Sequence, residues 1–239
     1  MSLGQQMLMP RKQKGFTLVE IAIVLVIIGL LLAGVMKGQE LINSAKVKNM
    51  INDFRTVSAI VSGYQDRFRV LPGDQSQAQL AAAFGSSATV TACTPLAAGL
   101  CAPNNGRIDG NWNSTSVAEE SYVFWQHVRK ANLLTGPIDI NDANYLPRNA
   151  DGGRIGVESG INSAGVSAPW IAGMRGSFFV CMDGVLGRYA KQIDVVMDDG
   201  NTASGSVMSM ASAGAGRGSS AVAAASVVDG EQYIVCASF

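Results

Sequence analysis

An uninterrupted apolar run near the N-terminal end dominates the hydrophobic pattern of the chain. From Phe16 to Met36 the only ionisable side chain is that of Glu20. At 1.5 Å per residue this run would form a helix about 31 Å long, enough to cross the hydrocarbon core of a bilayer. The pattern therefore predicts a membrane-spanning helix over 16–36.

The hydrophobic pattern becomes amphipathic after the apolar run. Apolar residues recur at steps of three and four between Val47 and Phe68, while lysines and acids occupy the other positions. Nothing breaks the helix before Pro72 and Gly73, so we expect one helix from Phe16 to about Arg69. Its second half, 37–70, is expected to pack against a sheet.

The remaining segment, 71–239, consists of short apolar stretches separated by Gly, Asn and Pro clusters, which indicates loops and tight turns. Ser116 and Glu119 fit a capping box that would start one further helix, which Gly136 and Pro137 would end. Stretches rich in β-branched and aromatic residues predict strands at 154–157, 177–182, 205–210 and 232–237. The expected fold is α+β: a long N-terminal helix packed on an antiparallel sheet in one head domain, 71–239.

Charge and composition indicate which classes of partner the chain can have and how it is oriented in a membrane. Lys plus Arg equals Asp plus Glu at 18 each, so nothing favours a nucleic-acid partner. The first fifteen residues contain Arg11, Lys12 and Lys14 and no acid. By the positive-inside rule these residues stay in the cytoplasm and the head faces outward.

Glu20 is the unusual residue of the apolar run. A carboxylate at mid-bilayer costs about 2.5 to 3.5 kcal/mol, so it is expected to have a partner or a function. Cleavage after Gly15 would make Phe16 a new N-terminus, and its ammonium would lie one helical turn from Glu20 of the same or a neighbouring molecule. Proteolysis would thereby create the compensating charge.

The stretch Lys14-Gly-Phe-Thr-Leu-Val-Glu20 resembles the processing site of type IV prepilins and of type II secretion pseudopilins, and the similarity is strongest over 11–73. The resemblance implies that 1–15 is a leader peptide, that a prepilin peptidase cuts after Gly15 and methylates Phe16, and that Glu20 guides assembly. Leu71-Pro-Gly-Asp, Trp125-Gln-His-Val and 193–200 also look like segments of large prepilin-type proteins.

The resemblance also implies partners and a location. The partners would be the prepilin peptidase and methyltransferase, identical or related pilin subunits in a helical filament, and inner-membrane assembly machinery. The chain would cross the bacterial inner membrane once, with its head in the periplasm, before entering an extracellular pilus or a periplasmic pseudopilus.

Alternatives to a pilus subunit stay open at this point. A pseudopilin of a type II secretion system would share the chemistry and differ in the machine. A membrane-tethered adhesion module would never polymerise. An ordinary secretory signal or a plain membrane anchor would explain the apolar run without explaining Glu20.

The four cysteines are expected to form two disulfides, because an exported domain meets an oxidising compartment and their spacing does not suggest zinc. Three pairings are possible, and free buried thiols are the alternative. We favour Cys93 with Cys101, which closes a short loop, and Cys181 with Cys236, which joins two strand candidates. The second pair resembles the C-terminal disulfide of pilins.

Catalytic signals are weak. His127 is the single histidine and falls inside the expected second helix, where a structural role is favoured, and the chain has neither a Gly-x-Ser-x-Gly motif nor a phosphate-binding loop. We therefore expect neither an enzyme nor a cofactor. Asp194, Asp198 and Asp199 could offer oxygens to calcium, although their spacing is not that of an EF-hand. The alternative is a helix end followed by an Asp-Gly turn.

Overall fold

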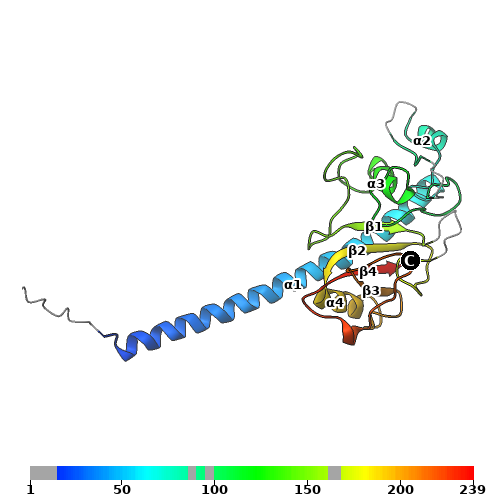
Figure 1. Ribbon diagram of the computed structural model, residues 1–239. Coiled ribbons are helices and arrows are strands. Elements are labelled where there is room, and N and C mark those ends of the chain that lie inside the picture. Colours follow the sequence, from blue (N-terminus) through cyan, green and yellow to red (C-terminus); the bar gives the residue numbers. More distant parts are fainter. Residues whose placement is uncertain (1–14, 86–89, 95–99, 161–167) are drawn as a thin grey trace, which may run out of the picture. The chain divides into compact units, whose positions relative to one another are not determined.

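The computed structural model describes residues 15–85, 90–94, 100–160 and 168–239, and Figure 1 shows its elements. The helices are α1 (Leu18–Phe68), α2 (Gln77–Phe84), α3 (Glu120–Lys130) and α4 (Gly187–Met197), with a short 3-10 helix at Ala224–Ser226. The strands are β1 (Ile155–Glu158), β2 (Phe179–Leu186), β3 (Val207–Ala211) and β4 (Gln232–Ser238). The predicted α+β, pilin-like architecture is confirmed.

The chain divides into two compact units, Met1–Asn43 and Ser44–Phe239. The first contains the apolar part of α1. The second, called the head unit below, contains the amphipathic part of α1 together with every strand and every other helix of the described residues.

The sheet of the head unit is antiparallel with strand order β1-β2-β4-β3. Side chains alternate between its two faces, as the pleat requires, except at the irregularity in β2 between Met182 and Val185. Val180 and Val235 belong to one apolar core, whereas Phe179 and Ile234, one position earlier on the same two strands, belong to another. Both faces of the sheet are therefore covered, and neither is left to solvent.

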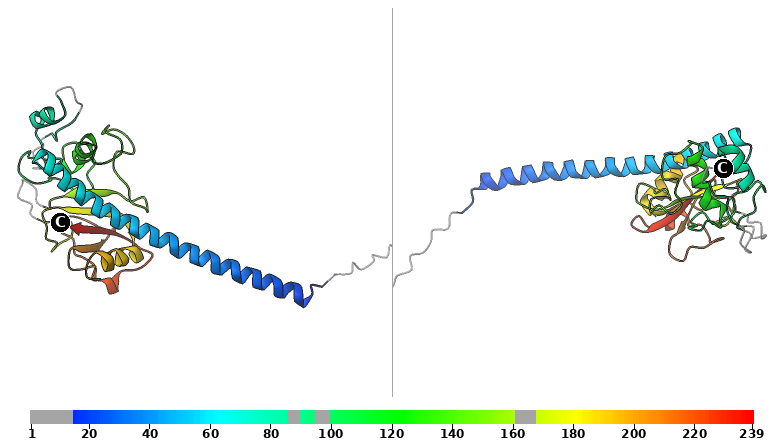
Figure 2. Two further views of the ribbon diagram at one scale, coloured as in Figure 1. Left: turned by 180° about the vertical axis from the view of Figure 1, so that it is seen from behind. Right: turned by 90° about the horizontal axis from the view of Figure 1, so that it is seen from above.

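The amphipathic part of α1 covers the first face, as Figure 2 shows from behind. Its buried residues recur at three- and four-residue steps from Val47 to Tyr64 and share a core with side chains of all four strands. This periodicity places one stripe of the helix against the sheet. The prediction that the second half of the helix seats a sheet is confirmed.

The second face is covered by loops rather than by a helix. Its core contains two tryptophans in an edge-to-face pair, Trp112 and Trp170, with ring centroids 5.7 Å apart, and the disulfide Cys181–Cys236. That disulfide joins residues directly opposite each other on β2 and β4. The second disulfide, Cys93–Cys101, closes a short loop. Both pairings favoured from the sequence are present.

The start of α3 corrects one prediction. No capping box forms between Ser116 and Glu119, because the helix begins only at Glu120 and Glu119 makes no side-chain cap. The Glu119 carboxylate instead accepts a hydrogen bond from the Asn111 amide at 2.6 Å, and the Ser116 hydroxyl accepts one from the Ala118 amide at 3.2 Å. The Glu119 carboxylate, which the local pattern assigned to the helix cap, therefore binds the preceding loop instead.

One helix, α2, was not predicted, and a second, α4, was foreseen only at its end, as the alternative to a calcium site. The short helix α2 follows a complete capping box between Ser76 and Gln79, a Ser-x-x-Gln pattern that is visible in the sequence. The other, α4, ends at Met197 and is followed by Asp198, Asp199 and Gly200. The alternative interpretation of 193–200 as a helix end entering an Asp-Gly turn is therefore correct for the backbone.

Candidate functional site

The predicted processing site lies immediately before α1. Gly15, Phe16 and Thr17 are described and non-helical, whereas Arg11, Lys12 and Lys14 lie outside the described residues. The Phe16 side chain is 81% exposed, and a Cβ added to Gly15 would have no atom within 4 Å. Among the described atoms, therefore, nothing obstructs the Gly15–Phe16 peptide bond.

Glu20, the acid predicted to guide assembly, has a local partner. The Thr17 amide and the Thr17 hydroxyl each donate a hydrogen bond to the same carboxylate oxygen of Glu20 at 2.8 Å. In return the Glu20 amide donates to the Thr17 hydroxyl oxygen at 3.2 Å. Because α1 begins at Leu18, Thr17 is the N-cap and Glu20 the third helical residue, so the pair forms a capping box. Sequence reasoning missed this role, although Thr-x-x-Glu signals it.

The surface of α1 between Leu18 and Met36 is apolar except at Glu20. Its large aliphatic side chains are exposed, from 91% at Leu18 to 46% at Ile28. The helix is long and apolar enough to cross a membrane, and a helix that is hydrophobic all round needs lipid or other helices around it. The apolar surface ends at an exposed ion pair, Lys37 with Glu40 at 2.6 Å.

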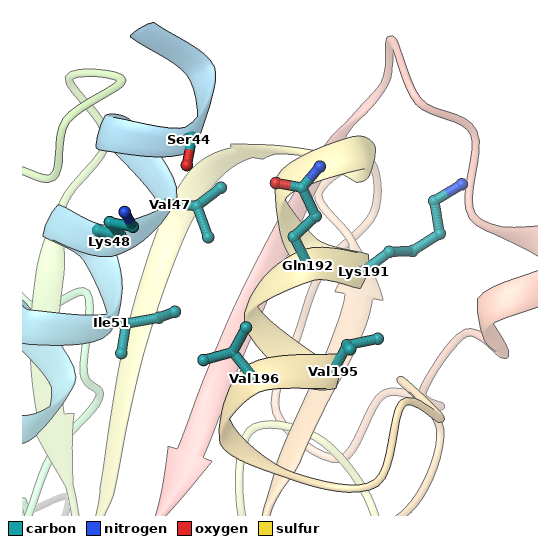
Figure 3. Close-up of a pocket in the computed structure, with 8 residues that line it drawn as sticks. All are labelled: Ser44, Val47, Lys48, Ile51, Lys191, Gln192, Val195 and Val196. Atoms are coloured by element: carbon teal, nitrogen blue, oxygen red, sulfur yellow. The ribbon is translucent and has the colours of Figure 1, made fainter. Parts of the chain in front are cut away.

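The head unit has an apolar groove between α1 and α4, shown in Figure 3, with a volume of about 350 Å³. Val47 and Ile51 point into it from α1, and Val196 faces them from α4. Val195 and Val196 are 65% and 59% exposed. The other lining residues are Ser44, Lys48, Lys191 and Gln192.

His127 has a structural role. It is fully buried in α3, its Nδ1 accepts a hydrogen bond from the Gly73 amide at 3.0 Å, and its Nε2 bonds the Thr91 carbonyl at 2.9 Å. A neutral imidazole protonated on Nε2 satisfies both contacts. Burial lowers the pKa of His127 to about 4. With both nitrogens bonded to backbone groups, this histidine is not free to act as a general base.

Two buried carboxylates organise the loop before α3. Asp74 accepts hydrogen bonds from the Asn105 and Gly106 amides at 3.0 and 2.8 Å. Glu120 accepts from the Ala102 and Asp109 amides at 2.9 and 2.8 Å. Burial, the largest effect, raises the pKa of Glu120 to about 8 although the amide bonds act against it. Both acids bind backbone amides, so their role is to stabilise the fold.

A buried ion pair fixes the segment between β3 and β4. Arg217 donates to both carboxylate oxygens of Glu158, at 3.1 and 2.8 Å, in the fork geometry that guanidinium and carboxylate share. The remaining Arg217 bonds go to the Ala168 and Gly110 carbonyls and to the Asn111 side chain. One side chain therefore ties its own loop to the end of β1 and to the segments at Gly110–Asn111 and Ala168.

The calcium candidates meet at the end of α4. One carboxylate oxygen from each of Asp194, Asp198 and Asp199 lies within 4.8 Å of the other two. Burial raises the pKa of Asp194 to about 6, and the charges of Asp199 and Asp198 add to this effect. The structure thus brings together all three acids that the sequence singled out.

The comparison with known proteins concerns the N-terminal segment. Residues 10–36 match the family model described as the prokaryotic N-terminal methylation motif. The chain has no significant match among curated proteins or among solved structures. The matched residues include Gly15, Phe16, the Thr17–Glu20 capping box and the exposed apolar part of α1. Residues 10–36 are therefore a segment of the type IV prepilin and pseudopilin type, and the apolar helix fits membrane anchoring.

Proposed function

We propose that this protein is a prepilin: it is cleaved after Gly15, methylated on the new amine of Phe16 and polymerised into a type IV pilus-like filament. The observation that carries the proposal is the apolar part of α1, whose side chains are exposed on all sides and which contains Glu20 as its single ionisable residue up to Met36. A surface of this kind is stable in lipid and, after transfer, in a bundle of like helices.

Cleavage changes the electrostatics at the start of α1. The new ammonium of Phe16 would lie at the N-terminus of the helix, where the macrodipole is positive and a cation is disfavoured. Glu20, the third helical residue, supplies a negative charge within the first turn. In the uncleaved chain this acid is held by Thr17. Processing adds a second partner of opposite charge to a carboxylate that is already positioned.

Assembly needs this charge because the apolar surface alone does not set a register. Moving a helix from lipid into a helical bundle gains little hydrophobic free energy, since lipid tails are as apolar as leucine. An ion pair between Glu20 of one subunit and the Phe16 amine of its neighbour would offset the cost of keeping each charge in an apolar environment. It would align successive subunits along the filament.

The proposed route follows from the same segment. Arg11, Lys12 and Lys14 keep the leader in the cytoplasm, the prepilin peptidase removes it, and inner-membrane machinery extracts the mature subunit. The head unit faces the periplasm and then the outside, where its two disulfides would persist.

The first test is the chemical identity of the mature N-terminus. The subunit is purified from cells of the source organism and its N-terminal peptide is analysed by mass spectrometry. A peptide that starts at N-methylated Phe16 supports the proposal. A peptide that retains residues 1–15, or export and polymerisation that persist after peptidase deletion, contradicts it.

The second test separates the charge of Glu20 from its cap. Glu20→Gln keeps the reciprocal capping box, because glutamine serves at the third helical position, and removes the charge. Glu20→Ala removes both. If the ion pair sets register, both variants insert in the membrane and neither enters filaments. The matched control is Glu40→Gln, an exposed acid of α1 outside the apolar run, which should assemble normally.

Fractionation of the cells distinguishes a type IV pilus from the pseudopilus of a type II secretion system. Recovery of the mature subunit in sheared surface fibres supports the pilus. Recovery only in a periplasmic secretion assembly would assign the subunit to a pseudopilus, and a monomer indifferent to Glu20→Gln would indicate a tethered module.

A further inference from the structure

We infer that the acidic cluster of Asp194, Asp198 and Asp199, at the C-terminal end of α4, binds a calcium ion. The inference concerns the head unit alone and does not depend on filament assembly. It rests on the environment of Asp194, on the charge around it and on the way the other two acids are held.

The Asp194 carboxylate is buried but accepts no hydrogen bond of full geometry. Asp194 is 0% exposed, and in the described part of the chain the Gly200 backbone makes a weak polar contact with it, but no hydrogen bond of full geometry reaches either carboxylate oxygen. A buried carboxylate without partners is costly and normally pairs with a cation, accepts hydrogen bonds or takes up a proton. One of its oxygens lies within 4.8 Å of oxygens from both other acids, so it faces into the cluster.

The electrostatic potential at the cluster is negative and favours a bound cation. Three carboxylates meet where α4 ends, and the macrodipole makes a helix C-terminus negative. The ion pairs formed by the described residues leave these three acids out, and the lysine of α4, Lys191, pairs with Asp229 instead. Within the described chain, the protein itself does not supply a neutralising cation.

The other two acids are held in place by the loop that follows α4. One oxygen of Asp198 accepts hydrogen bonds from the Ser206 and Val207 amides at 2.6 and 2.9 Å. Asp199 accepts from the Asn201 amide at 2.8 Å. Both carboxylates are therefore fixed before any ion arrives, which lowers the entropic cost of binding.

The donor set selects calcium among common cations. The cluster offers only hard carboxylate oxygens, and exposure rises from buried Asp194 through half-buried Asp198 to exposed Asp199. Calcium takes six to eight oxygen ligands in flexible geometry, so water can complete its shell on the open side. Magnesium requires near-ideal octahedral geometry and dehydrates reluctantly, which favours calcium at a buried carboxylate.

The test uses the full chain in detergent micelles, stripped with EGTA and titrated with calcium chloride at pH 7.5. Calorimetry should show one calcium ion per chain. At a calcium concentration one hundred times Kd the midpoint of thermal unfolding should rise by about 5 °C. Magnesium at the same concentration should give a smaller rise. An unchanged midpoint in calcium, or an equal effect of magnesium, would overturn the assignment.

Two variants locate the site. Asp194→Asn should abolish the calcium response while leaving the midpoint in EGTA unchanged or higher, because it removes an unpaired buried charge. Asp199→Asn, at an exposed position, should weaken calcium binding about tenfold. The matched control is Asp66→Asn, an exposed acid on α1, which should respond like the unmodified protein. A full calcium response in both cluster variants would refute the site.

Discussion

Thr17 holds Glu20: the hydroxyl and the amide of Thr17 both donate to one carboxylate oxygen of Glu20, each at 2.8 Å. The acid that the sequence singles out for assembly is thus also the residue that closes the first turn of α1. Substitutions at Thr17 and Glu20 can remove the helix cap and the charge separately, so their effects can be told apart.

Thr17→Ala should loosen the first turn of α1 without altering charge. Loss of an N-cap hydroxyl costs about 1 kcal/mol, which corresponds to roughly fivefold faster opening of that turn. Hydrogen exchange of the Glu20 amide, which bonds the Thr17 hydroxyl, and of the Ile21 amide, which bonds the Thr17 carbonyl, reports this opening on the uncleaved chain in micelles. Thr17→Ser retains the hydroxyl and should exchange at the original rate. Equal exchange in both variants would show that the cap does not stabilise the helix start.

His127 should make the head unit less stable in acid. Its pKa is about 4 in the folded protein and 6.5 as the ordinary value, so between these pH values the unfolded chain binds the extra proton. Stability from this group is complete above pH 6.5 and is lost as pH falls toward 4, by on the order of 3 kcal/mol. Denaturant unfolding in micelles at a series of pH values measures the effect.

The histidine contribution is isolated by comparison with His127→Gln, because Glu120 acts in the opposite direction. The raised pKa of Glu120 favours the folded state at low pH and disfavours it as pH rises toward 8. The difference in unfolding free energy between the two proteins should therefore grow from pH 4 to 6.5 and then stay level. A pH-independent difference would contradict the buried neutral state of His127.

Gly73→Ala should destabilise the junction between α1 and α3. Gly73 has φ of 97°, and an added Cβ would lie 2.7 Å from the Glu120 carbonyl oxygen. Strain in this backbone region costs about 1 to 3 kcal/mol, and the collision adds to it. Gly152→Ala is the matched control, since Gly152 also has positive φ, 86°, but open space around it. Thermal unfolding should show the larger loss at Gly73, and an equal loss at both positions would exclude the collision.

Arg217→Met should cost about 3 to 5 kcal/mol, because it leaves the fully buried Glu158 carboxylate without its cation. The double variant Arg217→Met, Glu158→Gln should regain part of this loss, since no charge then stays buried. Denaturant midpoints of the single and double variants measure the coupling. Additive losses would show that the two residues stabilise the fold independently.

The sequence predicted the elements that a simple periodicity defines. The helix α1, expected from Phe16 to about Arg69, runs from Leu18 to Phe68, and each of the four strands falls within a few residues of its predicted stretch. The pairing of Cys181 with Cys236 was favoured because it joins two strand candidates and resembles the C-terminal disulfide of pilins, and the structure contains it. These features depend on local pattern and on residue chemistry, which a single sequence displays.

Features that depend on long-range contacts were not predictable. Arg217 and Glu158 are 59 residues apart, and no local pattern marks either as the partner of the other. Glu119 shows that a long-range contact can also replace a predicted local one. Its carboxylate accepts a hydrogen bond from the Asn111 amide and does not form the cap that the spacing from Ser116 predicted. The cluster of Asp194, Asp198 and Asp199 could be proposed from spacing, but the lack of a full hydrogen bond to the Asp194 carboxylate is visible only in the folded chain.

The Cys181–Cys236 disulfide has a mechanical consequence. It joins the two central strands of the sheet, β2 and β4, at directly opposed positions, and β4 is the C-terminal strand. Force that peeled β4 from its neighbour would have to rupture a covalent bond, not only a ladder of hydrogen bonds. A head exposed to fluid shear on a cell surface would thus keep the middle of its sheet intact under a load that unzips a non-crosslinked pair of strands.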